Sequence, residues 1–178
     1  MENTSKVLEL GSCEEKIKIL ESLDCTDDPE ILEKIISKLD DNDIQVRGEA
    51  FSSLVLNENK ISNFLIKSLS SASKNIRGFT SLVLANRNET NAIPDIIKLT
   101  KDERSMVREC AIGALGYLKA QEAKETFLKS LSDSNLEVRK SAIQAIIDLN
   151  ITIPEGNMKE IIKEKDPEIK KLISQLKK

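Results

Sequence analysis

One basic residue returns every 30 or 31 positions along this chain, and that spacing limits what the chain can fold into. The residue is lysine or arginine each time, and an apolar residue precedes it in every unit except the first. The six positions are Lys16, Arg47, Arg77, Arg108, Arg139 and Lys170. A fixed period in this range indicates a stack of similar units that bury their apolar faces against one another. Such a stack presents a surface and not a deep pocket, which favours binding over catalysis.

The apolar residues within each period predict two helices. When the basic residue is numbered zero, positions minus one, plus three and plus seven share one helical face, as in Val46, Ala50 and Leu54. A second apolar segment precedes each of these, and a short polar run separates the two. We expect the first kind, the A helices, at 30–39, 61–69, 93–99, 123–131 and 156–164. We expect the second kind, the B helices, at 13–23, 44–57, 74–86, 105–118, 136–149 and 167–177.

The predicted fold is all-α, a right-handed α-solenoid of about five antiparallel helix pairs after one unpaired N-terminal helix. The composition agrees, because 6 glycines, 4 prolines and 3% aromatic residues are fewer than a β-rich protein usually needs. No interior linker interrupts the pattern, so residues 1–178 are expected to form a single repeat domain. The expected units are approximately 12–28, 29–57, 60–86, 91–118, 121–149 and 154–178.

Polar residues recur six positions before the basic residue. They are Asp41, Ser71, Asp102, Asp133 and Glu164. Aspartate and serine side chains can accept hydrogen bonds from the free N–H groups of a helix start, so we expect them to cap the B helices. We also expect a structural network that ties each turn to the next unit, made of Asp41, Asp102 and Asp133 with Arg47, Arg77, Arg108 and Arg139. The alternative is an anion-binding ladder along the same residues.

Two segments, LTKDERSMVRECAIGALGYLK (99–119) and LSDSNLEVRKSAIQAIIDL (131–149), resemble the HEAT-like repeat of the phycobilisome-lyase type. The shared pattern is a leucine, an aspartate, Val-Arg, spaced alanines and a following leucine. Residues 39–56 match it well and residues 69–85 loosely. The resemblance covers nearly the whole chain and implies a helical-repeat, armadillo-like superhelix. It implies little about activity, because the family includes chromophore-lyase subunits, a di-iron hydroxylase, DNA-repair glycosylases and many scaffolds.

The residues needed for common catalytic sites are missing from the sequence. There is no histidine, which excludes Ser-His and Cys-His pairs, histidine metal sites and the His-Glu motifs of the hydroxylase relatives. No glycine-rich phosphate loop occurs, and carboxylate pairs such as Asp27-Asp28 are adjacent and so point to different sides of a helix. We therefore predict a protein that is not an enzyme and that has no cofactor and no metal site.

The sequence also suggests where the protein resides. Cys13, Cys25 and Cys110 are odd in number and lack CxxC spacing, which favours reduced thiols in a cytoplasmic protein. The N-terminal segment has no long apolar core, so we expect no signal peptide, and no apolar run is long enough to cross a bilayer.

The B helices usually line the inner curve of such solenoids, so their exposed positions are the candidate binding face. At plus one, two, five and nine the two central units carry Phe79, Leu82, Cys110, Gly113 and Tyr117. The flanking units carry polar residues there, including Glu49, Ser52, Lys140, Ser141, Gln144 and Asp148. Apolar residues with a polar rim suggest a partner site, and a local twist that buries them in the core is the alternative.

We therefore predict a scaffold or adaptor that binds another protein through the concave B-helix face. The nearby Lys74, Arg104 and Arg108 would favour an acidic or amphipathic partner segment. The predicted contact residues are Phe79, Leu82, Cys110, Tyr117, Lys74 and Arg104.

Two other functions stay open. Residues 61–120 carry a net charge of +4, which would suit nucleic acid, but residues 1–60 carry −8, which argues against nucleic acid wrapped along the full length. The chain could also be a subunit of a lyase-type enzyme, as in the chromophore-lyase relatives, with Cys110 as the thiol to test.

Overall fold

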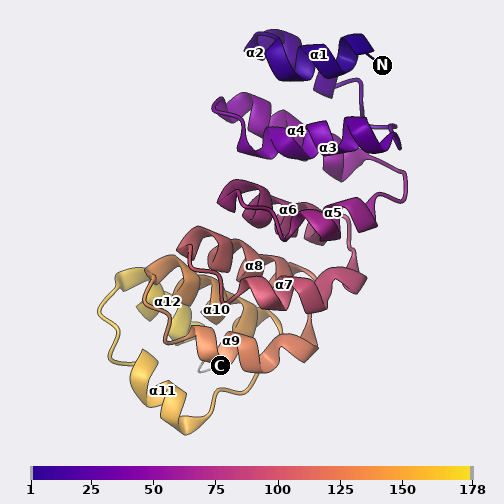
Figure 1. The fold of residues 1–178 in the computed structure, drawn as a ribbon. Coiled ribbons are helices and arrows are strands. Elements are labelled where there is room, and N and C mark those ends of the chain that lie inside the picture. The colour runs from indigo at the N-terminus through magenta and orange to yellow at the C-terminus, as the bar shows by residue number, and fades with distance from the viewer. Residues whose placement is uncertain (1, 177–178) are drawn as a thin grey trace. The chain divides into compact units, whose positions relative to one another are not determined.

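The computed structural model describes residues 2–176, and this part of the chain is entirely helical, with no β-strand (Figure 1). The A helices are α1 (Glu2–Leu10), α3 (Pro29–Ser37), α5 (Ser62–Ser68), α7 (Ile93–Leu99), α9 (Lys124–Ser130) and α11 (Glu155–Ile161). The B helices are α2 (Cys13–Leu20), α4 (Ile44–Leu56), α6 (Lys74–Asn86), α8 (Ser105–Tyr117), α10 (Leu136–Asp148) and α12 (Pro167–Leu176). Three short 3₁₀ helices adjoin A helices: η1 (Lys38–Asp40), η2 (Thr90–Ala92) and η3 (Gln121–Ala123). The predicted all-α class is confirmed, and all six B helices begin at the predicted residue.

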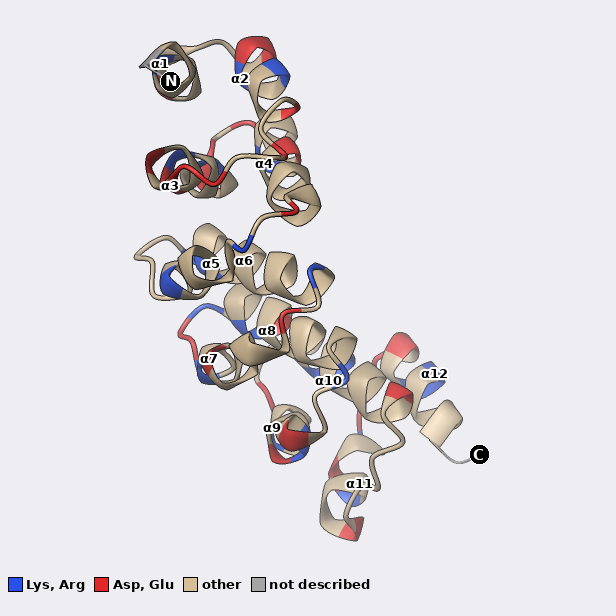
Figure 2. Ribbon diagram, turned by 90° about the vertical axis from the view of Figure 1, so that its right-hand side faces the viewer, with Lys and Arg blue, Asp and Glu red and all other residues tan. Residues whose placement is uncertain are grey.

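The chain forms two compact units, Met1–Ala92 with α1 to α6 (unit 1) and Ile93–Lys178 with α7 to α12 (unit 2). Within each unit, A and B helices alternate along the chain and stack as pairs. In unit 1 the A helices lie together on one side and the B helices on the other (Figure 2). The single domain expected from the sequence stays a prediction.

The N-terminal end differs from the prediction. We expected an unpaired B helix there, but α1 precedes α2 and packs against both α2 and α3. The described residues therefore hold six A–B pairs and not five pairs with a lone helix. The sequence ENTSKVLEL hides this helix because few of its residues are apolar, and Leu8 alone among its described residues is fully buried. The last predicted helix residue, Lys177, lies outside the described residues.

The side chains that cap α2, α4, α6, α10 and α12 lie four positions before the basic residue, and not six as predicted. In α8 this position is Arg104, whose side chain makes no capping hydrogen bond. The Asp43 carboxylate accepts hydrogen bonds from the N–H groups of Gln45 (2.7 Å) and Val46 (3.2 Å). The equivalent caps are Ser73, Asn135 and Asp166. The residues predicted as caps, Asp41, Ser71, Asp102, Asp133 and Glu164, instead accept a bond from the N–H of the minus-four residue. The physical reason is reach, because only the residue directly before a helix can touch its first free N–H groups.

The predicted apolar columns form the core of each unit. Val46, Ala50 and Leu54 are fully buried, and the same positions are buried in α8 and α10. Small residues allow close packing between α8 and α10, where a Cβ added to Gly116 would lie 3.1 Å from Cβ of Ala145. This packing turns the opposite side of each B helix toward solvent.

Candidate functional site

The arginines at position zero are each fixed by the turn before their own helix. Nη1 of Arg108 donates to the carbonyl oxygens of Asp102 (2.9 Å) and Glu103 (3.3 Å). Equivalent bonds to positions minus six and minus five are formed by Arg47, Arg77 and Arg139. These bonds satisfy turn carbonyls and set the direction of each guanidinium group.

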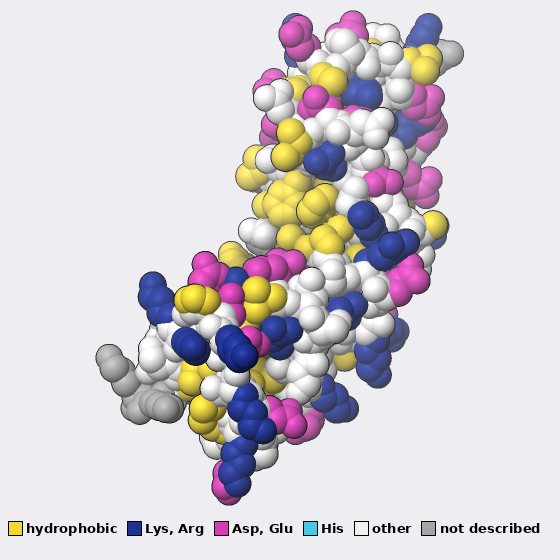
Figure 3. Space-filling model, turned by 90° about the vertical axis from the view of Figure 1, so that its left-hand side faces the viewer, with side chains coloured by type: hydrophobic (Ala, Val, Ile, Leu, Met, Phe, Trp, Pro, Cys, Tyr) yellow, Lys and Arg dark blue, Asp and Glu magenta, His cyan; other side chains and the backbone are white. Residues whose placement is uncertain are grey.

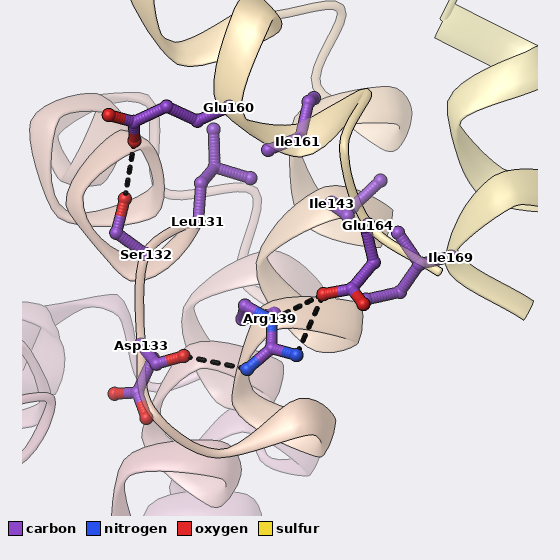
Figure 4. A pocket seen from close by; sticks show the side chains of 9 residues that line it. All are labelled: Leu131, Ser132, Asp133, Arg139, Ile143, Glu160, Ile161, Glu164 and Ile169. Atoms are coloured by element: carbon purple, nitrogen blue, oxygen red, sulfur yellow. Dashed lines mark hydrogen bonds and ion pairs between the residues drawn. The ribbon is translucent and has the colours of Figure 1, made fainter. Parts of the chain in front are cut away.

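In unit 2, the other edge of the guanidinium reaches the turn of the following repeat. Nε and Nη2 of Arg108 donate to the two carboxylate oxygens of Asp133 at 2.8 and 2.7 Å. Nε and Nη2 of Arg139 both donate to a single carboxylate oxygen of Glu164, Oε2, at 3.2 and 2.8 Å (Figure 4). The hydrogen bond from Arg108 holds the pKa of Asp133 below its usual value. We call this series of contacts the ladder, and its geometry is that of a structural tie.

In unit 1 the ladder has one ion pair and one gap. Nζ of Lys16 lies 2.9 Å from the Asp41 carboxylate. Arg47 comes next, but the minus-six residue of the following unit is Ser71, which carries no charge. Within residues 2–176, Arg47 forms no ion pair with a carboxylate, so its Nε and Nη2 lack the partner that Asp133 gives Arg108.

A pocket of about 290 Å³ lies beside the last ladder contact (Figure 4). Its lining includes Leu131, Arg139, Ile143, Ile161, Glu164 and Ile169. In this unit Ile161 is buried, while Ile162 is 50% exposed at the position where earlier units bury a leucine. The pocket is thus a packing gap beside α11, and its charged groups already have partners: Arg139 binds Glu164, Asp133 binds Arg108, and Glu160 accepts from Ser132.

A second set of ties at the far ends of the helices was missed by the sequence analysis. Arg87 directly follows α6. Its guanidinium donates to the carbonyls of Leu54 (3.0 Å), Asn57 and Asn59 (2.9 Å), at the end of α4 and just after it. A cation stabilises the C-terminal end of a helix. No period signals this contact, because the equivalent residues Thr26, Asn57, Leu118 and Leu149 carry no charge.

The outward face of the B helices in unit 1 carries an apolar group. Phe79 and Leu82 on α6 are half-buried, and Leu56 at the end of α4 is 65% exposed. Leu56 was not among the predicted residues, although it occupies the plus-nine position that pointed to Tyr117. Hydrophobic side chains gather on unit 1, in the upper part of Figure 3. The predicted cation Lys74 is exposed at the start of α6.

Two carboxylates lie at outward positions on the B-helix face of unit 1. Glu49 is at plus two of α4 and Glu21 at plus five of the α2 unit. Neither forms an ion pair within the described part of the chain. Partial burial and the nearby Glu21 carboxylate raise the pKa of Glu49.

The outward face in unit 2 carries an exposed tyrosine beside a hollow. Tyr117 is 63% exposed, beside a hollow of about 290 Å³ that is lined by Gly113, Gly116 and Gln144 among others. Cys110 is half-buried, and burial raises the pKa of its thiol to about 11. Very little of it is thiolate at neutral pH, which argues against a reactive cysteine. Arg104 is exposed and pairs with Glu103.

The described residues offer no candidate metal site. They contain no cluster of histidine, cysteine or acidic residues that could hold a metal ion. Every helix between residues 2 and 176 is too short or too polar to cross a membrane. Two of the basic residues that give residues 61–120 their positive net charge, Arg87 and Arg108, are occupied by contacts within the protein.

Comparison with known families and structures agrees with this repeat architecture. A model of HEAT repeats matches residues 62–147, and a model of the HEAT repeat associated with sister chromatid cohesion matches residues 19–48. No curated protein sequence matches the chain.

Several solved structures are similar in fold. The complex of CpcE and CpcF of phycocyanin lyase from Nostoc sp. PCC7120 aligns with a TM-score of 0.71 and 18% identity, over 85% of this chain and 100% of that one. A designed armadillo repeat protein in complex with the peptide (KR)4 aligns with a TM-score of 0.59 and 18% identity, over 98% and 96% of the two chains. A structure on TOG–tubulin binding specificity aligns with a TM-score of 0.59 and 15% identity, over 99% and 82%. The shared fold is the armadillo/HEAT solenoid.

Proposed function

Because the chain carries HEAT repeats over residues 19–48 and 62–147, we propose that it is a non-catalytic scaffold that binds another protein through the outward face of its B helices. The mechanism is a preformed helical surface. Its side chains are already held by the core and the ladder, so little conformational entropy is lost on binding.

The observation that carries this proposal is the apolar group on unit 1. Phe79, Leu82 and Leu56 occupy positions that the packing turns away from the core, yet all three are large and apolar. Contiguous apolar side chains on a soluble surface are a common sign of a protein contact. Aromatic anchors beside polar residues are typical of the residues that dominate binding energy.

Unit 2 offers a second contact of a different shape. Tyr117 stands beside the glycine-lined hollow, which is large enough to take one side chain of a partner. Tyrosine is well suited to this role because it is large and rigid and keeps a polar hydroxyl.

The similar solved structures support binding of peptides or proteins, since they include a designed armadillo repeat protein with a peptide, a complex of two lyase subunits, and a structure on TOG–tubulin binding. The lyase complex also supports the alternative that this chain is a subunit of an enzyme. The raised pKa of Cys110 gives that alternative no reactive thiol here.

The proposal is tested with the double variant Phe79→Ala/Leu82→Ala and, separately, Tyr117→Ala. Protein captured from lysate by the wild type is identified, purified and titrated against each variant by calorimetry. We expect the double variant to weaken binding at least about tenfold, as for central contact residues.

The control is Leu10→Ala, which removes an exposed apolar side chain from an A helix of the same unit. It should leave the affinity unchanged, and circular dichroism should show the same helix content in all variants. Equal binding by the folded Phe79→Ala/Leu82→Ala variant and the wild type would refute the proposed face.

A further inference from the structure

We infer that the segment bound on unit 1 is basic and carries a bulky apolar anchor; this inference rests on the proposed function and specifies its partner. The sequence alone suggested an acidic or amphipathic segment. The unpaired charges on unit 1 in the structure favour a basic one. The recognising elements are the unpaired carboxylates of Glu21 and Glu49 and the apolar group on α6.

The cations that suggested an acidic partner are mostly occupied. Arg108 is bound to Asp133 at 2.7 Å, and Arg104 lies 3.2 Å from Glu103. In unit 1, Lys16 is paired with Asp41. Lys74 remains exposed but is a single charge.

Two carboxylates on the outward face of unit 1, those of Glu21 and Glu49, form no ion pair within the described residues. Residues 1–92 contain 16 acidic and 11 basic residues, a net charge of −5. Glu49 is half-buried, lies near Glu21 and has no cation beside it within the described residues. A partly desolvated carboxylate without a partner is unfavourable, and a cation brought by a ligand removes that cost.

The stacking of helices sets the spacing of the partner. Glu21 belongs to the α2 unit, Glu49 to α4, and Phe79 and Leu82 to α6, and these B helices pack in that order. Packed helices lie about 8–10 Å apart. An extended chain covers about 10 Å in three residues. A matching segment therefore has two basic residues and then an apolar one, each three positions apart.

The experiment uses three fluorescent peptides that share a neutral, soluble background. The first has the order Lys-x-x-Lys-x-x-Phe; the second replaces both lysines with glutamate, and the third replaces Phe with alanine. Binding is measured by anisotropy at low and high salt. We expect the first peptide to bind about fivefold to tenfold more tightly than the second, in line with two exposed or half-exposed ion pairs. High salt should reduce this difference.

Two variants locate the contact. Glu21→Gln/Glu49→Gln should reduce affinity for the lysine peptide about fivefold and leave the glutamate peptide no weaker. The matched control is Glu122→Gln/Glu125→Gln, which removes two exposed carboxylates near an A helix of unit 2 and should change nothing.

The inference is overturned if the glutamate peptide binds as tightly as the lysine peptide, if neither peptide binds, or if Glu21→Gln/Glu49→Gln behaves like the control. None of these results alters the capture experiment with Phe79→Ala/Leu82→Ala. The proposed function fails only if that variant keeps the captured protein, so the two failures are distinguishable.

Discussion

At the scale of single residues, the ladder is defined by which atoms of arginine are used. Nη1 binds the turn before the helix, and Nε with Nη2 binds the carboxylate of the next unit, as in Arg108 and Asp133. This division explains why the basic residue recurs so regularly. Lysine can replace only part of the function, because its single ammonium group lacks the planar fork of arginine.

Asp133→Asn should lower the free energy of unfolding by about 1–2 kcal/mol at neutral pH, since the bidentate charged contact with Arg108 becomes a neutral one. The folded-state pKa of Asp133 is lowered, so its stabilisation is present above the unfolded pKa of about 3.9. It is lost as pH falls through the folded pKa. Urea unfolding at several pH values should therefore show the variant and wild type converging in acid.

The control for this experiment is Asp27→Asn, an exposed aspartate in unit 1. It should cost little at any pH. A difference between Asp133→Asn and wild type that stays constant down to the acid range would contradict the assigned ion pair.

At the scale of helices, the sequence predicted where the helices begin better than which residues bond to one another. The six B helices begin as expected because apolar periodicity and polar cap residues both mark that boundary. The cap itself was misplaced from Asp43 to Asp41, since several polar residues stand in each turn and only geometry distinguishes them. The first A helix was missed because α1 shows so few apolar residues.

The candidate site was predictable in part. The outward columns identified Phe79, Leu82 and Tyr117, but the exposure of Leu56 and the proximity of Glu21 to Glu49 needed the structure. Charges near a site can be counted from sequence. The sequence does not show which of these charges are already paired, because ladder partners lie 25 residues apart.

Ser71→Asp should strengthen the junction between α4 and α6, because it supplies the carboxylate that Arg47 lacks. We expect a gain of about 0.5–1 kcal/mol in the free energy of unfolding, typical of a partly exposed pair. The gain should vanish when Arg47→Ala is combined with it, in a double-mutant cycle followed by thermal melting. A gain that survives Arg47→Ala would come from another source.

The two glycines of α8 provide a matched pair of changes. Gly113→Ala meets nothing within 4 Å and should stabilise the protein by about 0.5–1 kcal/mol through helix propensity. Gly116→Ala brings its methyl group 3.1 Å from Ala145, so part or all of that gain should be lost. Melting temperatures of the two variants measured side by side check this, and an equal gain would show that α8 and α10 can separate without cost.

At the scale of the whole molecule, the ladder contacts within each compact unit join one helix pair to the next, as Lys16 does with Asp41 and Arg108 with Asp133. Stability in such repeat proteins is approximately a sum of unit and neighbour contributions. The two compact units each contain three helix pairs with their own core, and each presents its own outward face. A scaffold organised in this way can change one face by substitution at positions plus two, five and nine, while the buried columns stay constant.

The ladder has a consequence for how such a gene can change in length. Every contact joins position zero of one unit to position minus six of the next, so its register depends on the unit and not on the distance from either terminus. An in-frame duplication of one period would supply both halves of a new contact at once. The 30-residue spacing from Arg47 to Arg77, one residue shorter than the others and without its carboxylate, is the kind of local drift that such a copy can then accumulate.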